Sequence, residues 1–383
     1  MTAFNKKVLA VAIAASCIAG TAIAKERLNY AYGYPITSNV GKAFEIYSAA
    51  VTERSKGEIV MTGYPMTLLS TPEASAGVRD GLADVAFVLP PYHPADYPTN
   101  LFLHELNSLI NLVEEPTGKE PLAYSGAVLE YTFTKCPECL DEYKTQNQVF
   151  TAGTSTPVYG LLCKDVKITS LDDFKNKRMR VGSAGYVRFA EAFGAQAIRL
   201  PVGEAYEAMD QGVIDCAMLS MPELTNYNLY EVVTDITLGV PGGLFAGNAL
   251  ANVNRDRWLA MDDAGREAMI WGGSTLTANG TWISFVDHEA ALENARAQGI
   301  KIHQADPEFV AAVQAFVKED VASVATLFKE TYNVARAEEI AADFPPLLEK
   351  WNALIKDVES AEELNQIYWD QVMSKVDPAT YGQ

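Results

Sequence analysis

Apolar and polar positions repeat with two different periods along this 383-residue chain, and the changes between them predict most of its secondary structure. Residues 27–34 alternate as a strand, and residues 39–56 then carry apolar side chains at helical spacing until Gly57. Residues 59–64 and 85–89 again have the character of strands, with a short helix between them. Strands that alternate with helices in this way are typical of an α/β lobe built on a mostly parallel sheet.

The same alternation returns in residues 171–230, which predicts a second α/β unit. Residues 149–164 have the pattern of a strand, a turn and a strand, and we expect them to cross from the first lobe to the second. The glycine-rich residues 239–253 are the candidate for the return crossing. Residues 255–383 are helical in pattern, apart from a short strand at 300–302. A two-lobed, hinged clam-shell with long C-terminal helices is the predicted α/β fold.

The length of the chain also favours two lobes, because one ordinary core does not grow to this size. We expect lobe 1 to contain residues 25–155 and 245–285, and lobe 2 to contain residues 156–244 and 286–383. Residues 1–24 are set apart as a predicted signal peptide. They carry Lys6 and Lys7, an apolar core and an Ala-Ile-Ala cleavage signal. Soluble secretion is favoured over lipidation at Cys17, because Ala14 stands where a lipoprotein signal usually has leucine.

Without the signal peptide the chain has 28 basic and 49 acidic residues, a net charge of −21. Such an acidic surface argues against nucleic acid and anionic membranes as partners. Any site for an anion must therefore be locally positive against an unfavourable overall field.

Four cysteines remain after the signal peptide, enough for two disulfides whose pairing the sequence leaves open: Cys136, Cys139, Cys163 and Cys216. Cys136 and Cys139 form a CxxC motif, which we interpret as a local disulfide in an exposed loop. A thioredoxin-like site needs its CxxC between a strand and a helix, and a zinc site needs two further ligands. The four histidines have no ligand spacing, so we expect no cofactor.

Arg180 is the main candidate for ligand binding, because it ends a short apolar strand at the start of the second α/β unit. Ligands of open α/β sheets bind outside the carboxyl ends of the strands, here in the crevice between the lobes. A guanidinium stays charged and presents a planar fork of donors that matches a carboxylate. Its neighbours Arg178 and Arg188 are interpreted as surface charges.

Residues 171–230, with "LDDFKNKRMRV", "GAQAIRLPVGEAYEAMDQGVID" and "LYEV", resemble the solute-binding proteins of tripartite ATP-independent periplasmic (TRAP) transporters. The opening "GYPITSNVGKAFEIYSAAVTERSKGEI" and "GVRDGLADVAFV" also fit this dicarboxylate-binding-protein family, so the resemblance covers the whole mature chain. It implies a periplasmic protein that captures an organic anion and delivers it to a sodium-driven membrane permease. The family's carboxylate-clamping arginine falls on Arg180. A long helix that braces both lobes is also typical, and residues 307–332 or the helix from 346 onward are the candidates.

The chain departs from the family pattern at two positions that often contact the ligand. Leu219 stands where an asparagine is frequent, and Tyr159 stands where a second arginine is frequent. One arginine surrounded by tyrosines suits a monoanion, either a carboxylate or a sulfonate, with an apolar or hydroxylated body.

The remaining candidate ligand contacts lie in the predicted strand–helix turns: Asn39, Glu73, Tyr92, Ser183 and Tyr186. Asn39 and Glu73 are equally explained as residues of helix starts, and Ser183 is placed to present backbone donors to an anion. Two other functional interpretations stay open, a periplasmic thiol-redox enzyme that uses Cys136 and Cys139 and a ligand-sensing subunit. The sequence shows no nucleophile–base pair that would support hydrolysis.

Overall fold

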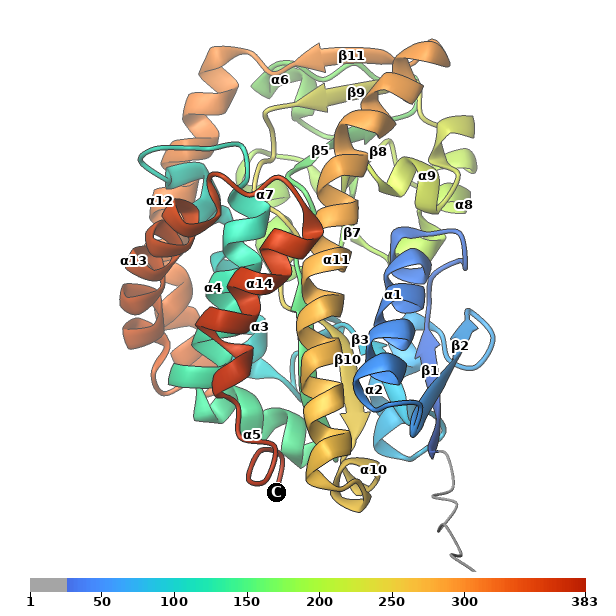
Figure 1. Cartoon of the computed structure of the whole chain (residues 1–383). Coiled ribbons are helices and arrows are strands. Elements are labelled where there is room, and N and C mark those ends of the chain that lie inside the picture. The colour runs from blue at the N-terminus through green and yellow to red at the C-terminus, as the bar shows by residue number, and fades with distance from the viewer. Residues whose placement is uncertain (1–25) are drawn as a thin grey trace, which may run out of the picture.

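The structure is a computed structural model that describes residues 26–383, so the predicted signal peptide lies outside the described residues. Two mixed sheets, each with its own helices, form two lobes that lie one above the other in Figure 1. This confirms the predicted two-lobed α/β fold. Within the described part of the chain, no helix is both long and apolar enough to cross a membrane.

The first sheet has five strands in the order β2-β1-β3-β10-β4. Its strands are β1 (Glu26–Tyr32), β2 (Ile59–Pro65), β3 (Val85–Val88), β4 (Gln148–Thr154) and β10 (Asn248–Asn254). β1 pairs in parallel with β2 and β3, as the strand–helix alternation predicts, whereas β10 is antiparallel to β3 and β4.

The second sheet has six strands in the order β11-β9-β5-β8-β6-β7. Its strands are β5 (Tyr159–Cys163), β6 (Arg178–Val181), β7 (Gln196–Arg199), β8 (Cys216–Ser220), β9 (Asp235–Leu238) and β11 (Lys301–Gln304). β6 is parallel to both β7 and β8, so the carboxyl ends of these three strands share one edge.

Helices cover both sheets and continue into a C-terminal group. Those of the first two-thirds of the chain are α1 (Asn39–Arg54), α2 (Ala74–Arg79), α3 (Pro98–Glu105), α4 (Glu120–Lys135), α5 (Pro137–Thr145), α6 (Leu171–Phe174), α7 (Ala184–Ala192), α8 (Ala205–Asp210), α9 (Glu223–Asn226) and α10 (Arg255–Ala260). The others are α11 (Asp263–Ala297), α12 (Pro307–Tyr332), α13 (Ala337–Ile355) and α14 (Ala361–Gln371).

The chain passes between the sheets at the two places that the sequence predicts. Residues 155–158 join β4 to β5, and residues 239–247 join β9 back to β10. The two crossings are hydrogen-bonded to each other, from the Thr156 amide to the Phe245 carbonyl (2.8 Å) and from the Tyr159 amide to the Gly243 carbonyl (3.0 Å). Through these bonds the second crossing lies against the start of β5.

The helix that braces both lobes is α11, and the prediction that placed this role on residues 307–332 or on the last helix is wrong. α11 is 35 residues long and packs on α1 and β4 of the first sheet, and its far end reaches β11 of the second (Figure 1). Gly272 and Gly273 of α11 would not be identified as core residues from an apolar period in the sequence. Because they have no side chains, they allow α11 to lie close to α1 and β4. A Cβ at Gly273 would lie 2.1 Å from the Thr151 carbonyl oxygen of β4.

The domain boundaries stay a prediction, and the structure adds two facts that bear on them. The boundary expected after residue 285 falls inside α11, which is continuous there. The last two helices, assigned to lobe 2, pack on elements that cover the first sheet: α13 on α4, and α14 on α11. Their apolar faces find that partner because α12 carries the chain back along the molecule (Figure 1).

The four cysteines form two buried disulfides, Cys136–Cys139 and Cys163–Cys216. Cys163 and Cys216 are directly opposite each other in the antiparallel pair β5–β8, so this bond ties two central strands together. The expectation of an exposed CxxC loop is wrong. Pro137 begins α5 immediately after α4, and this helix junction places Cys136 and Cys139 at 1% and 0% exposure.

Candidate functional site

Arg180 lies on β6, paired with Ile198 of β7 and Ala217 of β8 near the shared carboxyl edge of these strands. Its side chain is 1% exposed, which makes it one of the largest fully buried side chains among the described residues. No carboxylate lies within 4.0 Å of its nitrogens among residues 26–383. A buried cation without an acidic partner is unfavourable, so this position is arranged to receive an anion.

Neutral groups hold the guanidinium in place. Arg180 Nε donates to the Leu200 carbonyl (3.0 Å), and Nη2 donates to the Tyr92 hydroxyl (3.4 Å). A Cβ at Gly182 would lie 3.3 Å from both terminal nitrogens, so the backbone passes close beside the charged group. These contacts fix the orientation of the fork without neutralising its charge.

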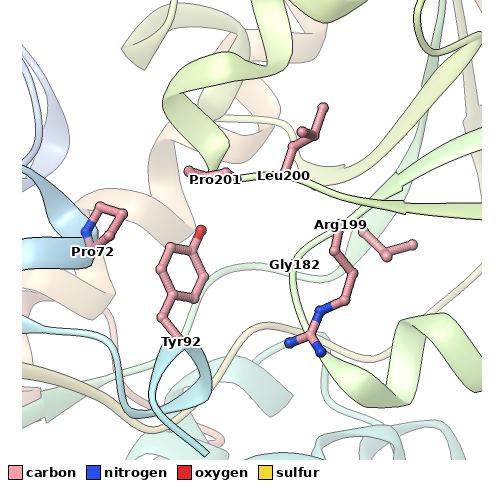
Figure 2. Close-up of a pocket in the computed structure, with 7 residues that line it drawn as sticks. Pro72, Tyr92, Gly182, Arg199, Leu200 and Pro201 are labelled. Atoms are coloured by element: carbon pink, nitrogen blue, oxygen red, sulfur yellow. The ribbon is translucent and has the colours of Figure 1, made fainter.

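Tyr92 reaches this arginine from the other lobe, from the short 3-10 helix Pro90–Tyr92 that follows β3. Its hydroxyl also accepts from the Val202 amide (3.3 Å), so it connects β3 to the turn after β7. Figure 2 shows the Tyr92 ring standing between Pro72 and the Leu200–Pro201 segment, with its hydroxyl directed toward that segment. These residues line a cavity of about 240 Å³ together with Val181, Gly182 and Arg199.

Tyr159 and Tyr186 form a stacked aromatic pair, and Tyr159 lies near Arg180. Their rings stack with centroids 5.0 Å apart and planes 12° apart. Burial raises the pKa of Tyr159, while the charge of Arg180 and a hydrogen bond to it oppose this rise, so the two groups are neighbours. The Tyr186 hydroxyl instead donates toward the Gly242 and Leu244 carbonyls (3.3 and 3.2 Å), which ties it to the return crossing.

The structure places the other candidate ligand contacts either in the cleft or in the elements that pack behind it. Ser183 is fully buried, and its Oγ has no hydrogen-bond partner among residues 26–383. Asn39 lies at the start of α1, where its amide donates to Asn226 Oδ1 (3.1 Å) across the cleft. Leu219 is buried in β8 opposite Gly160 and presents no polar group there.

Glu73 does not reach the arginine. Its exposed carboxylate accepts from the Ser70 amide (3.0 Å) and hydroxyl (2.6 Å), a capping box that lowers its pKa. The neighbouring Pro72 is the residue of this loop that lines the cavity.

Arg178 and Arg188 are both paired with acids. Arg178 contacts Asp215 (2.5 Å) and is partly exposed, as the sequence predicts for a surface charge. Arg188 is not a surface charge. It lies between Glu105 of α3 (2.8 Å) and Asp320 of α12 (2.6 Å), with its side chain 22% exposed, because α12 covers this face of α7.

Glu223 is the residue at the site that the sequence analysis missed. It starts α9, three residues after β8, and is 7% exposed. Burial raises its pKa to about 7, against the lowering by a hydrogen bond from Asn226 and by the charge of Arg180. An acid that follows a mostly apolar strand of the predicted cleft was the available signal, since such turns line the binding crevice.

Comparison with known proteins shows which family this chain is similar to. Residues 163–327 match the model of the bacterial extracellular solute-binding proteins, family 7. A TRAP solute-binding protein from a marine metagenome, specific for aromatic acids, superimposes with a TM-score of 0.73 at 21% identity, over 85% of this chain and 99% of that one. Over these residues the chain is similar to this solute-binding family, and over most of its length it has the same fold.

Other solved structures show the same fold. A TRAP solute-binding protein of Rhodoferax ferrireducens with copurified benzoate matches with a TM-score of 0.69 at 20% identity, over 86% of this chain and 99% of that one. A Bordetella pertussis receptor that binds pyroglutamic acid gives 0.68 at 20% identity, over 85% and 99%.

Two curated proteins are similar in sequence to this chain. One is a solute-binding protein of Albidiferax ferrireducens, 25% identical over 51% of this chain; the match spans only 54% of that protein's length. The other is an outer membrane transporter protein, TsaT, of Comamonas testosteroni, 24% identical over 73% of this chain and 78% of that protein.

The site of this chain offers the buried Arg180, the exposed Arg199 at the cavity wall, several phenol hydroxyls and one buried carboxyl group. Between residues 26 and 383, no group of three or more His, Cys, Asp or Glu side chains is placed to hold a metal ion. The arrangement can bind, orient and desolvate a small anion through Arg180.

Proposed function

We propose that this protein captures a small organic monoanion in the cleft between its two sheets and delivers it to a membrane permease. Arg180 binds the anionic group, and Tyr92 and Tyr159 flank it. Domain closure about the two crossings and α11 is the motion that admits and encloses the ligand.

The observation that supports this function is the buried guanidinium of Arg180, which has no carboxylate partner among the described residues. A bound carboxylate would supply the missing negative charge and accept two parallel hydrogen bonds. A second arginine is absent from the position held by Tyr159, so one anionic group, rather than two, suits the site.

Aromatic monocarboxylates are the ligand class we propose. The walls around Arg180 carry aromatic rings at stacking distances, with Tyr34 lying 5.6 Å from Phe87 and 5.3 Å from Tyr227 between ring centroids. Flat rings pack well against such surfaces. Among the proteins with this fold, one is specific for aromatic acids and another holds benzoate.

The location and partner follow from the same proposal. The predicted signal peptide would export the chain to the periplasm, where a permease of the TRAP type would receive the ligand. We propose binding without a chemical step. The disulfide of the CxxC motif supports this, since both sulfurs are buried and a redox enzyme needs an accessible thiol.

A thermal-shift screen tests the function, with benzoate, phenylacetate, 3-hydroxybenzoate, pyroglutamate, a uronate and a sulfonate as probes. A ligand should raise the melting temperature in proportion to the logarithm of its concentration above Kd. We expect Arg180→Ala to abolish this rise while the unliganded protein still unfolds cooperatively. Arg178→Ala, two residues away on the same strand, is the matched control and should keep the rise. Wild-type affinity in Arg180→Ala would refute the assignment.

A further inference from the structure

The second cavity of the cleft is lined by polar groups rather than by a cation. It has a volume of about 40 Å³, and its polar lining comes from both lobes and from α11: Asn39, Thr156, Glu223, Asn226, Asn248 and Ser284. Tyr34 and Phe87 complete its aromatic side. A polar cavity of this kind, whose lining does not include Arg180, needs an explanation that the anion clamp does not provide.

Glu223 and Arg180 lie at one edge of the second sheet. Because β6 and β8 are parallel neighbours, their carboxyl ends meet there, and Glu223 follows β8 by three residues. The two groups are close enough for the guanidinium to lower the pKa of this carboxyl. Tyr159 lies near both, since its pKa responds to both charges.

Glu223 is held at one oxygen and has no protein partner at the other. Asn226 Nδ2 donates to Glu223 Oε2 (3.2 Å), whereas no donor among residues 26–383 reaches Oε1. Asn248 has unmet hydrogen-bonding capacity in the same cavity: its side chain is 5% exposed and its Oδ1 has no partner in the described part of the chain. Buried polar groups are normally satisfied, so both side chains are suited to a ligand group.

We infer that Glu223 is a specificity-determining residue, which selects monocarboxylates that carry a hydroxyl or N–H donor remote from the carboxylate held by Arg180. The inference rests on the proposed function. The donor enters the cavity beside Asn248 and gives its hydrogen bond to Glu223 Oε1. A second carboxylate at that place would meet the negative charge of Glu223 and is rejected.

The same residue connects ligand selection to closure of the cleft. Asn226, which holds Glu223, also accepts from the Asn39 amide at the start of α1, and this bond joins the second lobe to the first. A ligand donor on Glu223 therefore supports the geometry in which α9 and α1 are in contact.

The test compares acids that differ by one group. Benzoate, 3-hydroxybenzoate, 4-hydroxybenzoate, isophthalate and terephthalate are titrated into the full-length mature protein by calorimetry at pH 8, where Glu223 is ionised. We expect the better hydroxybenzoate to bind the wild type about 10- to 100-fold more tightly than benzoate, because a hydrogen bond to a charged group has this effect. The two diacids should bind more weakly than benzoate.

Glu223→Leu should reduce the preference for the hydroxy acid to about twofold or less while benzoate still binds. Glu223→Gln keeps the size and the contact with Asn226 but loses the charge, so it should keep a preference of a few-fold, since neutral hydrogen bonds are about half as strong. If the leucine variant does not fold, the comparison of Glu223→Gln with the wild type tests the inference. Glu204→Leu, an exposed acid of the same lobe, is the control and should keep the full preference.

The outcomes separate the two proposals. Equal affinity for benzoate and both hydroxybenzoates in the wild type, with binding lost in Arg180→Ala, would overturn the inference and leave the proposed function standing. An undiminished preference in Glu223→Leu or in Glu223→Gln would also overturn it. If none of the five acids binds, the proposed aromatic ligand class is refuted and the inference fails with it.

Discussion

Two arginines eight residues apart, the buried Arg180 on β6 and the half-buried Arg188 on α7, have opposite surroundings. Arg188 contacts two carboxylates, Glu105 and Asp320, from two other helices. Arg180 contacts the Leu200 carbonyl and the Tyr92 hydroxyl. The first charge is neutralised by the fold, whereas the second can be neutralised by a ligand. In this chain, the missing partner, rather than the presence of an arginine, is the observation on which the proposed binding site rests.

The largest effect on stability is expected from removing the satisfied arginine. Arg188→Met should lower the free energy of unfolding by about 3–5 kcal/mol, because it leaves the carboxylate of Glu105 buried without a cation. Urea denaturation of the unliganded protein measures this loss. Ligand affinity of the folded fraction should change by about twofold or less, since Arg188 has no contact with the site.

Arg178→Met is the control for that measurement, because its pair with Asp215 is partly exposed and should contribute about 1 kcal/mol or less. If Arg188→Met were as stable as the control, the contrast between Arg180 and Arg188 would lose its basis.

The second prediction concerns the dependence of stability on pH. Burial raises the pKa of Glu223 from 4.5 to about 7, so the folded protein holds this proton more tightly than the unfolded chain. The resulting stabilisation is complete below about pH 4.5 and is lost as the pH rises through about 7, in total on the order of 3 kcal/mol.

The free energy of unfolding should therefore fall in the wild type relative to Glu223→Gln between pH 5 and pH 8, without ligand. Taking the difference removes the contributions of His93, His104 and His288, whose lowered pKa values act in the opposite direction. A difference that is constant across this range would show that Glu223 is not buried in the unliganded protein.

The third prediction separates the charge of Arg180 from its shape. Arg180→Lys keeps the charge but replaces the planar fork by a single ammonium group, which cannot donate two parallel bonds or maintain the contact of Nε with Leu200. We expect ligand affinity to fall about 10- to 100-fold in calorimetric titrations, less than in Arg180→Ala. Retention of full affinity would mean that the site needs only a positive charge.

The sequence predicted those parts of the molecule that depend on local periodicity and strand ends. The two crossings, the position of Arg180 at a strand edge and the position of Tyr92 after a strand can be inferred from apolar runs and the turns that follow them, whereas Tyr159 was chosen from the family pattern. The bracing role of α11 could not, because it depends on contacts with α1 and β4 that are far away in the chain. The same reason hid the environment of Arg188, since Asp320 lies 132 residues away. Glu223 was missed because only the folded cleft shows that its turn is buried.

The smallest effect is expected at Tyr92. This residue accepts a hydrogen bond from Arg180 as an acidic side chain would, but it is neutral. Its hydroxyl accepts from Nη2 of Arg180 and from the Val202 amide, and so it links the two lobes on one side of the ligand. Tyr92→Phe keeps the ring against Pro72 and Pro201 but removes this acceptor. We expect ligand affinity to fall about three- to tenfold, the range for one hydrogen bond of about 1 kcal/mol.

The unliganded protein should lose little stability, because water can replace the hydroxyl when the cleft is open. If the loss of affinity instead equalled that of Arg180→Ala, Tyr92 would be a direct ligand contact rather than a support for the arginine.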